Sequence, residues 1–433
     1  MSEVFRNWAG NQVATPIEVR TPSCTREVAA AVAEAAETGR RVRMAGSGHS
    51  FTGVALTEGL LLRPHALTGV REAGDGRVRV AAGTPLHVLN EELHRRGLAL
   101  ANMGDITAQT VAGAIQTGTH GSGRDVGGLA DQVAALELVL ADGSVVEVGE
   151  DDPDPERRDL FDAARVGLGA LGVVTEVTLK VVPAFRLRSE RRPMRFGEVL
   201  ETLEELTTRN EHVDFFWFPH TDFCMVKLHN RDDGPVTGSG GFKRWFDNVF
   251  LENTVFGAVC EVGTLFPRTI PAINRLSGRA LTAAAYTDVS HRVFATVRRV
   301  RFLEMEYAIP AERLPQALRE VRDLIDRGDW NIVFPVEVRV SPPSDAWLST
   351  AYGRATAYLA FHVYRRMPLP AYFEAAEQIM VRLDGRPHWG KLHTRDAAYL
   401  ATAYPRFGDF AALRARLDPR RLFGNDHLDA VLG

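Results

Sequence analysis

The chain of 433 residues contains little cysteine and little lysine. Its three cysteines, Cys24, Cys224 and Cys260, are odd in number and far apart in sequence. This pattern fits neither a zinc site nor a disulfide framework, and it favours a reducing compartment. Only four of the 51 basic residues are lysines, a skew that suggests a GC-rich bacterial genome rather than a function.

An excess of one charge is also missing. The 51 basic and 55 acidic residues give a formal net charge of −4, so the basic footprint of a nucleic-acid-binding protein is absent and no nucleic-acid partner is expected. No apolar run reaches the roughly 18 residues of a transmembrane helix. The first twenty residues include Glu3, Arg6, Glu18 and Arg20 with no apolar stretch between them, which argues against a signal peptide and, with the cysteines, predicts a cytoplasmic protein.

Several enzyme motifs are missing as well. The sequence has no G-x-x-x-x-G-K-[ST], no G-x-S-x-G and no H-E-x-x-H, the simplest signatures of NTPases, α/β-hydrolases and zincins. A G-x-G-x-x-G match at Gly167, Gly169 and Gly172 follows a helix-like stretch and precedes a strand. A dinucleotide site needs the opposite order, so this match predicts tight helix-to-strand packing.

The length and the periodicity indicate an α+β protein of two large domains. Apolar residues make up 45% and charged residues 24% of the chain, as in globular proteins. The composition of the sequence changes at Pro183, which places a domain boundary near residue 183. We expect helices at 26–37, 85–96, 198–208, 314–327 and 371–382, and strands at 41–45, 60–62, 77–81, 133–140, 144–148, 173–182, 214–218, 333–340 and 357–364. A two-residue turn at Asp142-Gly143 is expected to join strands 133–140 and 144–148, and the later strands predict an antiparallel sheet flanked by helices.

Two glycine-rich loops are the first candidate site. Residues 43–51 and 102–123 place glycines among small hydroxylated side chains. Glycine lets a ligand approach the backbone, and successive N–H groups form a nest for anionic oxygens such as those of a diphosphate. Each loop taken alone is more often an ordinary connection.

Five segments together carry a family resemblance: Asn7-Trp8-Ala9-Gly10, Gly46-Ser47-Gly48-His49-Ser50-Phe51, Thr117-Gly118-Thr119-His120-Gly121, Pro387-His388-Trp389-Gly390-Lys391 and Asp418-Pro419. The chain resembles the vanillyl-alcohol-oxidase class of flavoproteins, specifically the sugar-1,4-lactone oxidoreductases that include gulonolactone and arabinonolactone oxidases. It is also similar to alditol oxidase. The resemblance implies an FAD-binding domain at 1–183, a substrate-binding cap domain at 184–395, and a segment 396–433 that returns toward the flavin domain.

The resemblance also implies the cofactor and its attachment. In the family, the histidine of G-S-G-H-S-F carries FAD through a covalent bond, so His49 is expected to be the attachment site. The expected cofactor-binding residues lie in the two glycine loops and at the start of strand 173–182. They are Arg43, Gly46, Ser47, Gly48, His49, Ser50, Gly104, Asp105, Thr110, Gly113, Thr117, Gly118, Thr119, His120, Gly121, Gly123 and Val173. No metal site is expected.

The catalytic residues are expected on two strands and one loop. Strand alternation puts Glu337 and Arg339 on the same side of one strand, and His362 and Tyr364 on the same side of another. Without the resemblance, both pairs would be read as solvated sheet faces. With it, Glu337, Arg339 and Lys391 are expected beside the substrate, and His362 as a proton acceptor or substrate anchor. The identity of the general base stays open.

The expected reaction is oxidation of L-gulono-, L-galactono- or D-arabinono-1,4-lactone at the C2 hydroxyl. Asp105 and Tyr364 stand where the polyol-oxidising branch has serine and threonine, so they favour a lactone over xylitol-type polyols. Gly104 stands where dehydrogenase relatives carry a larger residue, so it favours O₂ as acceptor, with a non-oxygen acceptor as the alternative. A flavin-free carbohydrate-binding module is the alternative from another class, and no residue favours it. The preferred lactone and the oligomeric state are not predictable from the sequence.

Overall fold

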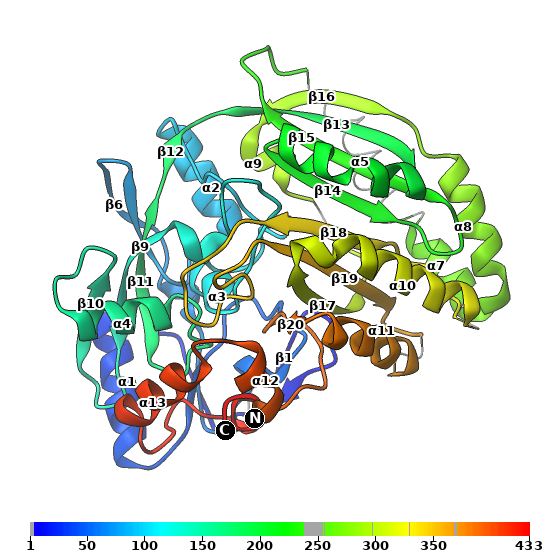
Figure 1. The fold of residues 1–433 in the computed structure, drawn as a ribbon. Coiled ribbons are helices and arrows are strands. Elements are labelled where there is room, and N and C mark those ends of the chain that lie inside the picture. Colours follow the sequence, from blue (N-terminus) through cyan, green and yellow to red (C-terminus); the bar gives the residue numbers. More distant parts are fainter. Residues whose placement is uncertain (1–3, 238–253, 255, 297, 329, 368–369) are drawn as a thin grey trace.

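A computed structural model describes residues 4–237, 254, 256–296, 298–328, 330–367 and 370–433. The first part of the chain folds around two sheets (Figure 1). The parallel three-stranded sheet has the order β3 (Glu18–Arg20), β5 (Leu60–Leu62), β4 (Val42–Met44). The antiparallel five-stranded sheet has the order β10 (Val145–Gly149), β9 (Val133–Val139), β11 (Val173–Lys180), β7 (Arg77–Ala81), β6 (Val70–Gly74). Two short pairs are β1 (Phe5–Arg6) with β2 (Val13–Ala14), and β8 (Leu98–Ala99) with β12 (Val182–Pro183).

Helices complete this part by burying apolar faces. In α1 (Thr25–Glu37), Val28, Ala31, Val32 and Ala35 are buried, the i, i+3, i+4, i+7 spacing of a helix that packs on a core with one side. The other helices here are α2 (Leu86–Arg95), α3 (Val111–Gln116) and α4 (Pro155–Ala164). The first core therefore forms between these helices and the sheets.

The second part is built on an eight-stranded antiparallel sheet. Its order is β16 (Ala284–Val289), β13 (Arg186–Arg195), β15 (Phe223–Arg231), β14 (His212–Trp217), β18 (Val336–Ser341), β19 (Thr356–Tyr364), β17 (Phe302–Pro310), β20 (Arg386–Pro387). Helices α5 (Phe196–Arg209), α10 (Leu314–Arg327) and α11 (Pro370–Arg382) pack on this sheet (Figure 1). Of the helices α7 (Phe256–Leu265), α8 (Ile270–Arg279) and α9 (Ser290–Phe294), α8 contacts β15, and α9 contacts β13 and β16.

The two faces of this sheet differ in chemistry because alternate residues of a strand point to opposite sides. One face presents side chains such as Phe215, Val338 and Leu359 to the apolar core under α5, α10 and α11. The other face presents buried polar side chains, among them Glu304 and Glu337. A polar face that is buried marks the place to look for a site.

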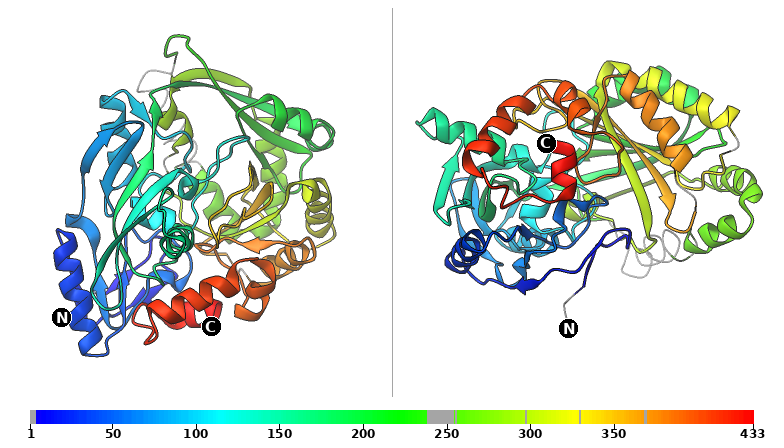
Figure 2. Two further views of the ribbon diagram at one scale, coloured as in Figure 1. Left: turned by 60° about the vertical axis from the view of Figure 1, so that its left-hand side comes forward. Right: turned by 90° about the horizontal axis from the view of Figure 1, so that it is seen from below.

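The end of the described chain returns to the first part. Helices α12 (Ala397–Ala403), α13 (Phe407–Leu417) and α14 (Asp426–Leu432) share the first core, and the N–H of Val42 in β4 donates to the Leu422 carbonyl at 2.8 Å. Figure 2 shows this red segment beside the blue and cyan elements. Trp347 and Trp389 also belong to the first core. The domain limits at residues 183 and 395 stay a prediction.

The α+β class is confirmed, and most expected elements are present with shifted ends. The strand expected at 333–340 begins at Val336, because Pro335 has no N–H for the ladder. The prediction of a two-residue turn at Asp142-Gly143 is wrong. The Leu140 N–H donates to the Ser144 carbonyl at 2.9 Å, so residues 141–143 form a three-residue loop. Gly143 in this loop has φ +82°. Within the described ranges, no helix is long and apolar enough to cross a membrane.

Candidate active site

The loop that follows β4 exposes a row of backbone amides. Within the described chain, the N–H groups of residues 46–50 donate to no protein acceptor. Gly48 adopts φ +72°, and a Cβ on Gly46 would collide with the Thr110 hydroxyl, so both positions require glycine. Consecutive unpaired amides of this kind form a nest for anionic oxygens.

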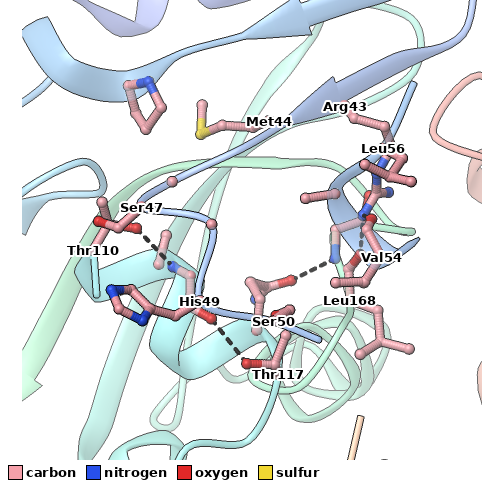
Figure 3. A pocket seen from close by; sticks show the side chains of 18 of the residues that line it. Arg43, Met44, Ser47, His49, Ser50, Val54, Leu56, Thr110, Thr117 and Leu168 are labelled. Carbon is pink, nitrogen blue, oxygen red and sulfur yellow. Dashed lines mark hydrogen bonds between the residues drawn. The ribbon is translucent and has the colours of Figure 1, made fainter. Parts of the chain in front are cut away.

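These amides line an elongated cavity, which we call the glycine-lined cavity (Figure 3). It encloses about 980 Å³ including its open mouth. Ten of the expected cofactor residues line it: Arg43, Gly46, Ser47, Gly48, His49, Ser50, Thr110, Gly113, Thr117 and Val173. Sequence reasoning missed Leu168, Gly169, Gly172 and Phe423, which also line it. The rejected glycine motif therefore contributes a wall of this cavity although it lacks the dinucleotide-binding order.

The Arg43 side chain connects the segments that form this wall. Its buried guanidinium donates to the carbonyls of Gly169 at 2.9 Å, Phe423 at 2.8 Å, Leu168 at 2.6 Å and Val54 at 2.5 Å. Burial lowers the pKa of Arg43 to about 9. Since both of its terminal nitrogens donate to carbonyls of different segments, Arg43 fixes the cavity walls to one another.

His49 lies where the glycine-lined cavity meets a second cavity, because its side chain lines both. Its ring stacks on Trp8 with centroids 5.6 Å apart. Burial, with the nearby Lys391 ammonium, lowers the pKa of His49 to about 4. The imidazole is therefore neutral at physiological pH and keeps a nucleophilic nitrogen.

The second cavity, which we call the charged cavity, is formed by the polar face of the large sheet against the loops of the first part. One chain of ion pairs crosses it. Glu337 lies 2.5 Å from Arg339, Arg339 lies 3.3 Å from Asp105, and Asp105 lies 2.9 Å from Arg298. Although burial opposes ionisation, Arg339 and Arg298 hold the pKa of Asp105 well below its usual range.

A second set of contacts joins Lys391, Glu304 and His362. The Lys391 ammonium contacts the Glu304 carboxylate directly, and His362 Nε2 lies 3.5 Å from Glu304 and 4.0 Å from Glu337. Burial raises the pKa of Glu304, but Lys391 and His362 outweigh it and bring the value to about 2. Burial would likewise lower the pKa of Lys391, but Glu304 and Glu306 raise it. The cavity thus holds a permanent cation beside a permanent anion.

A third group surrounds Glu306. His120 Nε2 lies 3.3 Å from Glu306, and its ring stacks on Tyr358 with centroids 3.5 Å apart. His120, Glu306 and His388 are close enough to hold a metal ion, but the Gly390 N–H donates to His388 Nδ1 at 3.1 Å. A His388 bound to a metal through Nε2 would carry its proton on Nδ1, against that N–H, so this contact disfavours a metal ion at His388.

The structure brings most expected site residues to these two cavities, with exceptions. Glu337, Arg339, Lys391, His362, Gly104, Asp105, Thr119 and His120 line the charged cavity. Tyr364 does not: it lines a neighbouring cavity and donates its hydroxyl to Glu261. Gly121 lines a third cavity, and Gly118 and Gly123 line none of these.

Sequence reasoning missed Glu304, Glu306, Arg298 and His388, which line the charged cavity. A signal for the two glutamates was available. Glu304 and Glu306 alternate with Met305 and Tyr307 inside the otherwise apolar β17, and an apolar strand with carboxylates at every second position has one polar face.

Comparison with known proteins agrees with this geometry. Residues 177–431 match the family model described as D-arabinono-1,4-lactone oxidase, and residues 16–149 match an FAD binding domain. The L-gulono-1,4-lactone dehydrogenase of Mycobacterium tuberculosis (strain ATCC 25618 / H37Rv) is 42% identical over all of both chains. The L-gulonolactone oxidase of Bos taurus is 32% identical over 99% of this chain and 98% of its own. The solved structure of cholesterol oxidase from Brevibacterium sterolicum covers 100% of this chain and 97% of its own with TM-score 0.82 at 18% identity, which shows a shared fold.

Proposed function

Because the chain belongs to the D-arabinono-1,4-lactone oxidase family, a group of FAD-linked oxidoreductases that act on CH–OH, we propose that it oxidises the C2 hydroxyl of L-gulono-, L-galactono- or D-arabinono-1,4-lactone. The observation that carries the proposal is the meeting of two cavities at His49: one lined by glycines and free amides, the other by Glu337, Arg339 and Lys391.

The residues of the glycine-lined cavity fit FAD. The free amides of residues 46–50 would hold the diphosphate, and Gly46 permits the close approach of Thr110 that shapes the wall. FAD, when bound, accepts the hydride from the carbon that is oxidised. The neutral imidazole of His49, at the junction of the cavities, supports a covalent link to the flavin.

That link has a direct test. Acid precipitation of the purified protein should leave yellow flavin in the pellet, and His49→Ala should release it into the supernatant. Trp8 stacks on the ring but offers no comparable nucleophile, so Trp8→Phe serves as the control and should keep the flavin bound. Full release of flavin from the unaltered protein would exclude the covalent link.

Glu337, Arg339 and Lys391 would orient the lactone and stabilise negative charge as the hydroxyl is oxidised. A unit charge at 4 Å contributes about 4 kcal/mol at an effective dielectric of 20, so one buried cation such as Lys391 can supply a large part of the rate. Its partner Glu304 keeps the ammonium in place.

His362 is the group that would accept the hydroxyl proton, at Nε2. Two carboxylates, those of Glu304 and Glu337, lie within 4.0 Å of this nitrogen. Phe302 and Phe334 pack against the imidazole with ring centroids 5.0 and 5.9 Å away, which restricts its orientation. General-base catalysis needs this kind of fixed geometry.

Gly104 supports O₂ as the electron acceptor. A Cβ at this position would lie 3.1 Å from the His120 carbonyl and from Thr119 Cγ2, so a larger residue would fit only if these neighbours shifted by a few tenths of an ångström. Gly104→Ala should lower peroxide production more than reduction of an artificial dye. Equal losses in both assays would remove Gly104 from acceptor choice, and wild-type turnover with dye alone would assign a non-oxygen acceptor.

The activity itself is tested by anaerobic bleaching of the flavin absorbance. Gulono-, galactono- or arabinono-1,4-lactone should bleach it, whereas xylitol should bleach it far more slowly, because Asp105 is held by two arginines and not free to bind a flexible polyol. Faster bleaching by xylitol would identify an alditol oxidase. The cytoplasmic location is likewise a proposal, supported by the three unpaired cysteines.

A further inference from the structure

A third cavity, separate from the two described, lies on the same polar face of the large sheet. It occupies about 660 Å³ including its mouth, and it is bordered by strands β13, β14, β15 and β18. Asp105, Arg298 and Arg339 line both this cavity and the charged cavity. The third cavity therefore begins where the charged cavity ends.

Two buried polar atoms in its lining have no hydrogen-bond partner. Ser189 is 1% exposed and His229 is 7% exposed, yet Ser189 Oγ and His229 Nδ1 are unpaired within the described chain. The two residues lie directly opposite each other on β13 and β15, so their side chains share this face. Burying such groups without partners is costly, and neighbouring unpaired groups point to a ligand that completes them.

A third polar group lies beside them. Asp214 on β14 is directly opposite Lys227 on β15 and Arg339 on β18. His229 Nε2 is 3.7 Å from the Asp214 carboxylate, beyond hydrogen-bonding distance. Burial raises the pKa of Asp214, against the opposing effect of Lys227 and Arg339. Ser189, His229 and Asp214 thus form a continuous polar strip leading toward Arg339.

The composition of the strip indicates which chemistry it recognises. An anion would meet the carboxyl groups of Asp214 and Asp105, and a cation would meet Lys227 and Arg339. Hydroxyl groups both donate and accept, so they match a lining of both kinds. Phe216, Tyr286 and Phe294 add aromatic surface to the same lining, and the apolar faces of a sugar can pack there.

We propose that the third cavity binds a second sugar unit carried by the lactone on the part of the ring remote from the oxidised carbon. This inference rests on the proposed function. Neighbouring strands lie about 4.8 Å apart, so a substituent that leaves Arg339 on β18 passes β14 and β15 and reaches Ser189 on β13 after about 14 Å, which is farther than a chain of two or three carbons extends. Lactones with long hydroxylated substituents are then bound more tightly than lactones without them.

The test compares substrates in one variant. The substrates are 2-hydroxy-γ-butyrolactone, which has no side chain, and, as the long lactone, a hexono-1,4-lactone that carries a glycosyl unit on its side chain. In Ser189→Ala, the ratio of KM for a long lactone to KM for the short one should rise about three- to tenfold, the loss expected for one hydrogen bond. Ser277→Ala, on the exposed surface of α8, is the matched control and should keep the wild-type ratio. A ratio unchanged in Ser189→Ala would overturn the proposal.

A binding measurement separates this proposal from the proposed function. Calorimetric titration with a 2-deoxyhexono-1,4-lactone that carries the same glycosyl unit, and lacks the hydroxyl to be oxidised, should show binding that weakens by the same factor in Ser189→Ala. If that holds while no lactone is oxidised, the proposed function fails and the third-cavity site stands. If lactones are oxidised but Ser189→Ala binds the deoxy lactone as the wild type does, water alone satisfies the strip and the site is excluded.

Discussion

At the scale of single residues, the charged cavity depends on Lys391, one of only four lysines in the chain. Lys391 is in contact with Glu304, and its pKa is raised by Glu304 and Glu306 against the effect of burial. It therefore remains a cation throughout the neutral range. If the proposed function holds, such a charge would be fixed beside the substrate before reaction and would need no reorganisation during the oxidation.

Replacing this cation should slow the reaction sharply. Lys391→Met is expected to lower kcat about 100-fold, the loss typical of removing one electrostatic donor from an active site. Lys180→Met is the control, since Lys180 is half-exposed and paired with Glu150 on the surface. Steady-state oxidation of gulono-1,4-lactone gives both values, and a thermal scan checks that each variant is folded. Unchanged kcat in Lys391→Met would remove the lysine from the mechanism.

At the scale of secondary-structure elements, β17 supplies both carboxylates that were not expected. Glu304 and Glu306 face the cavity while Met305 and Tyr307 enter the apolar core. A strand of this kind stays neutral on one side and charged on the other. The contribution of β17 to the stability of the folded protein therefore depends on pH.

The direction of that dependence follows from Glu304. Its pKa is about 2 in the folded protein, against about 4.3 for an unperturbed glutamate. A depressed pKa adds stability that is complete above about pH 4.3 and is lost as the pH falls toward 2. Urea unfolding at several pH values should show this loss in the wild type and a shallower slope in Glu304→Gln. Equal slopes would show that Glu304 is not held ionised.

Sequence reasoning succeeds where a feature is local and fails where it depends on strand pairing. The two-residue period places Glu337 and Arg339 together, and the structure pairs them at 2.5 Å. The same period places Tyr364 on the side of His362, yet Tyr364 lines the neighbouring cavity and not the charged cavity. Periodicity gives the face of a strand but not its position along a cavity, which is set by the order of eight strands. That order arises from contacts between residues far apart in sequence.

At the scale of the whole molecule, the glycine-lined cavity is closed by segments from both ends of the described chain. The Phe423 carbonyl accepts from Arg43, 380 positions earlier, and its side chain is 1% exposed in the first core. Cofactor binding and global stability are therefore linked through one residue of the returning segment.

Truncating this side chain should reveal the link. Phe423→Ala is expected to cost about 3–5 kcal/mol of unfolding free energy, as for other buried phenylalanines, and to reduce the FAD content of the purified protein. Leu276→Ala is the control because Leu276 is 72% exposed, and it should change stability by less than about 0.5 kcal/mol. Urea unfolding and the ratio of flavin to protein absorbance measure the two effects. Normal flavin content in a destabilised Phe423→Ala would separate the two properties.

The return of helices α12 to α14 to the first core also has a consequence for biosynthesis. Leu400, Phe410 and Leu428 pack in that core, but the ribosome delivers them only after the whole large sheet has been made. Until then, the first part of the chain keeps apolar surface exposed, while the part built on the large sheet can already fold around its own core. Chaperones that bind nascent chains should therefore hold the amino-terminal portion longest, although it leaves the ribosome first.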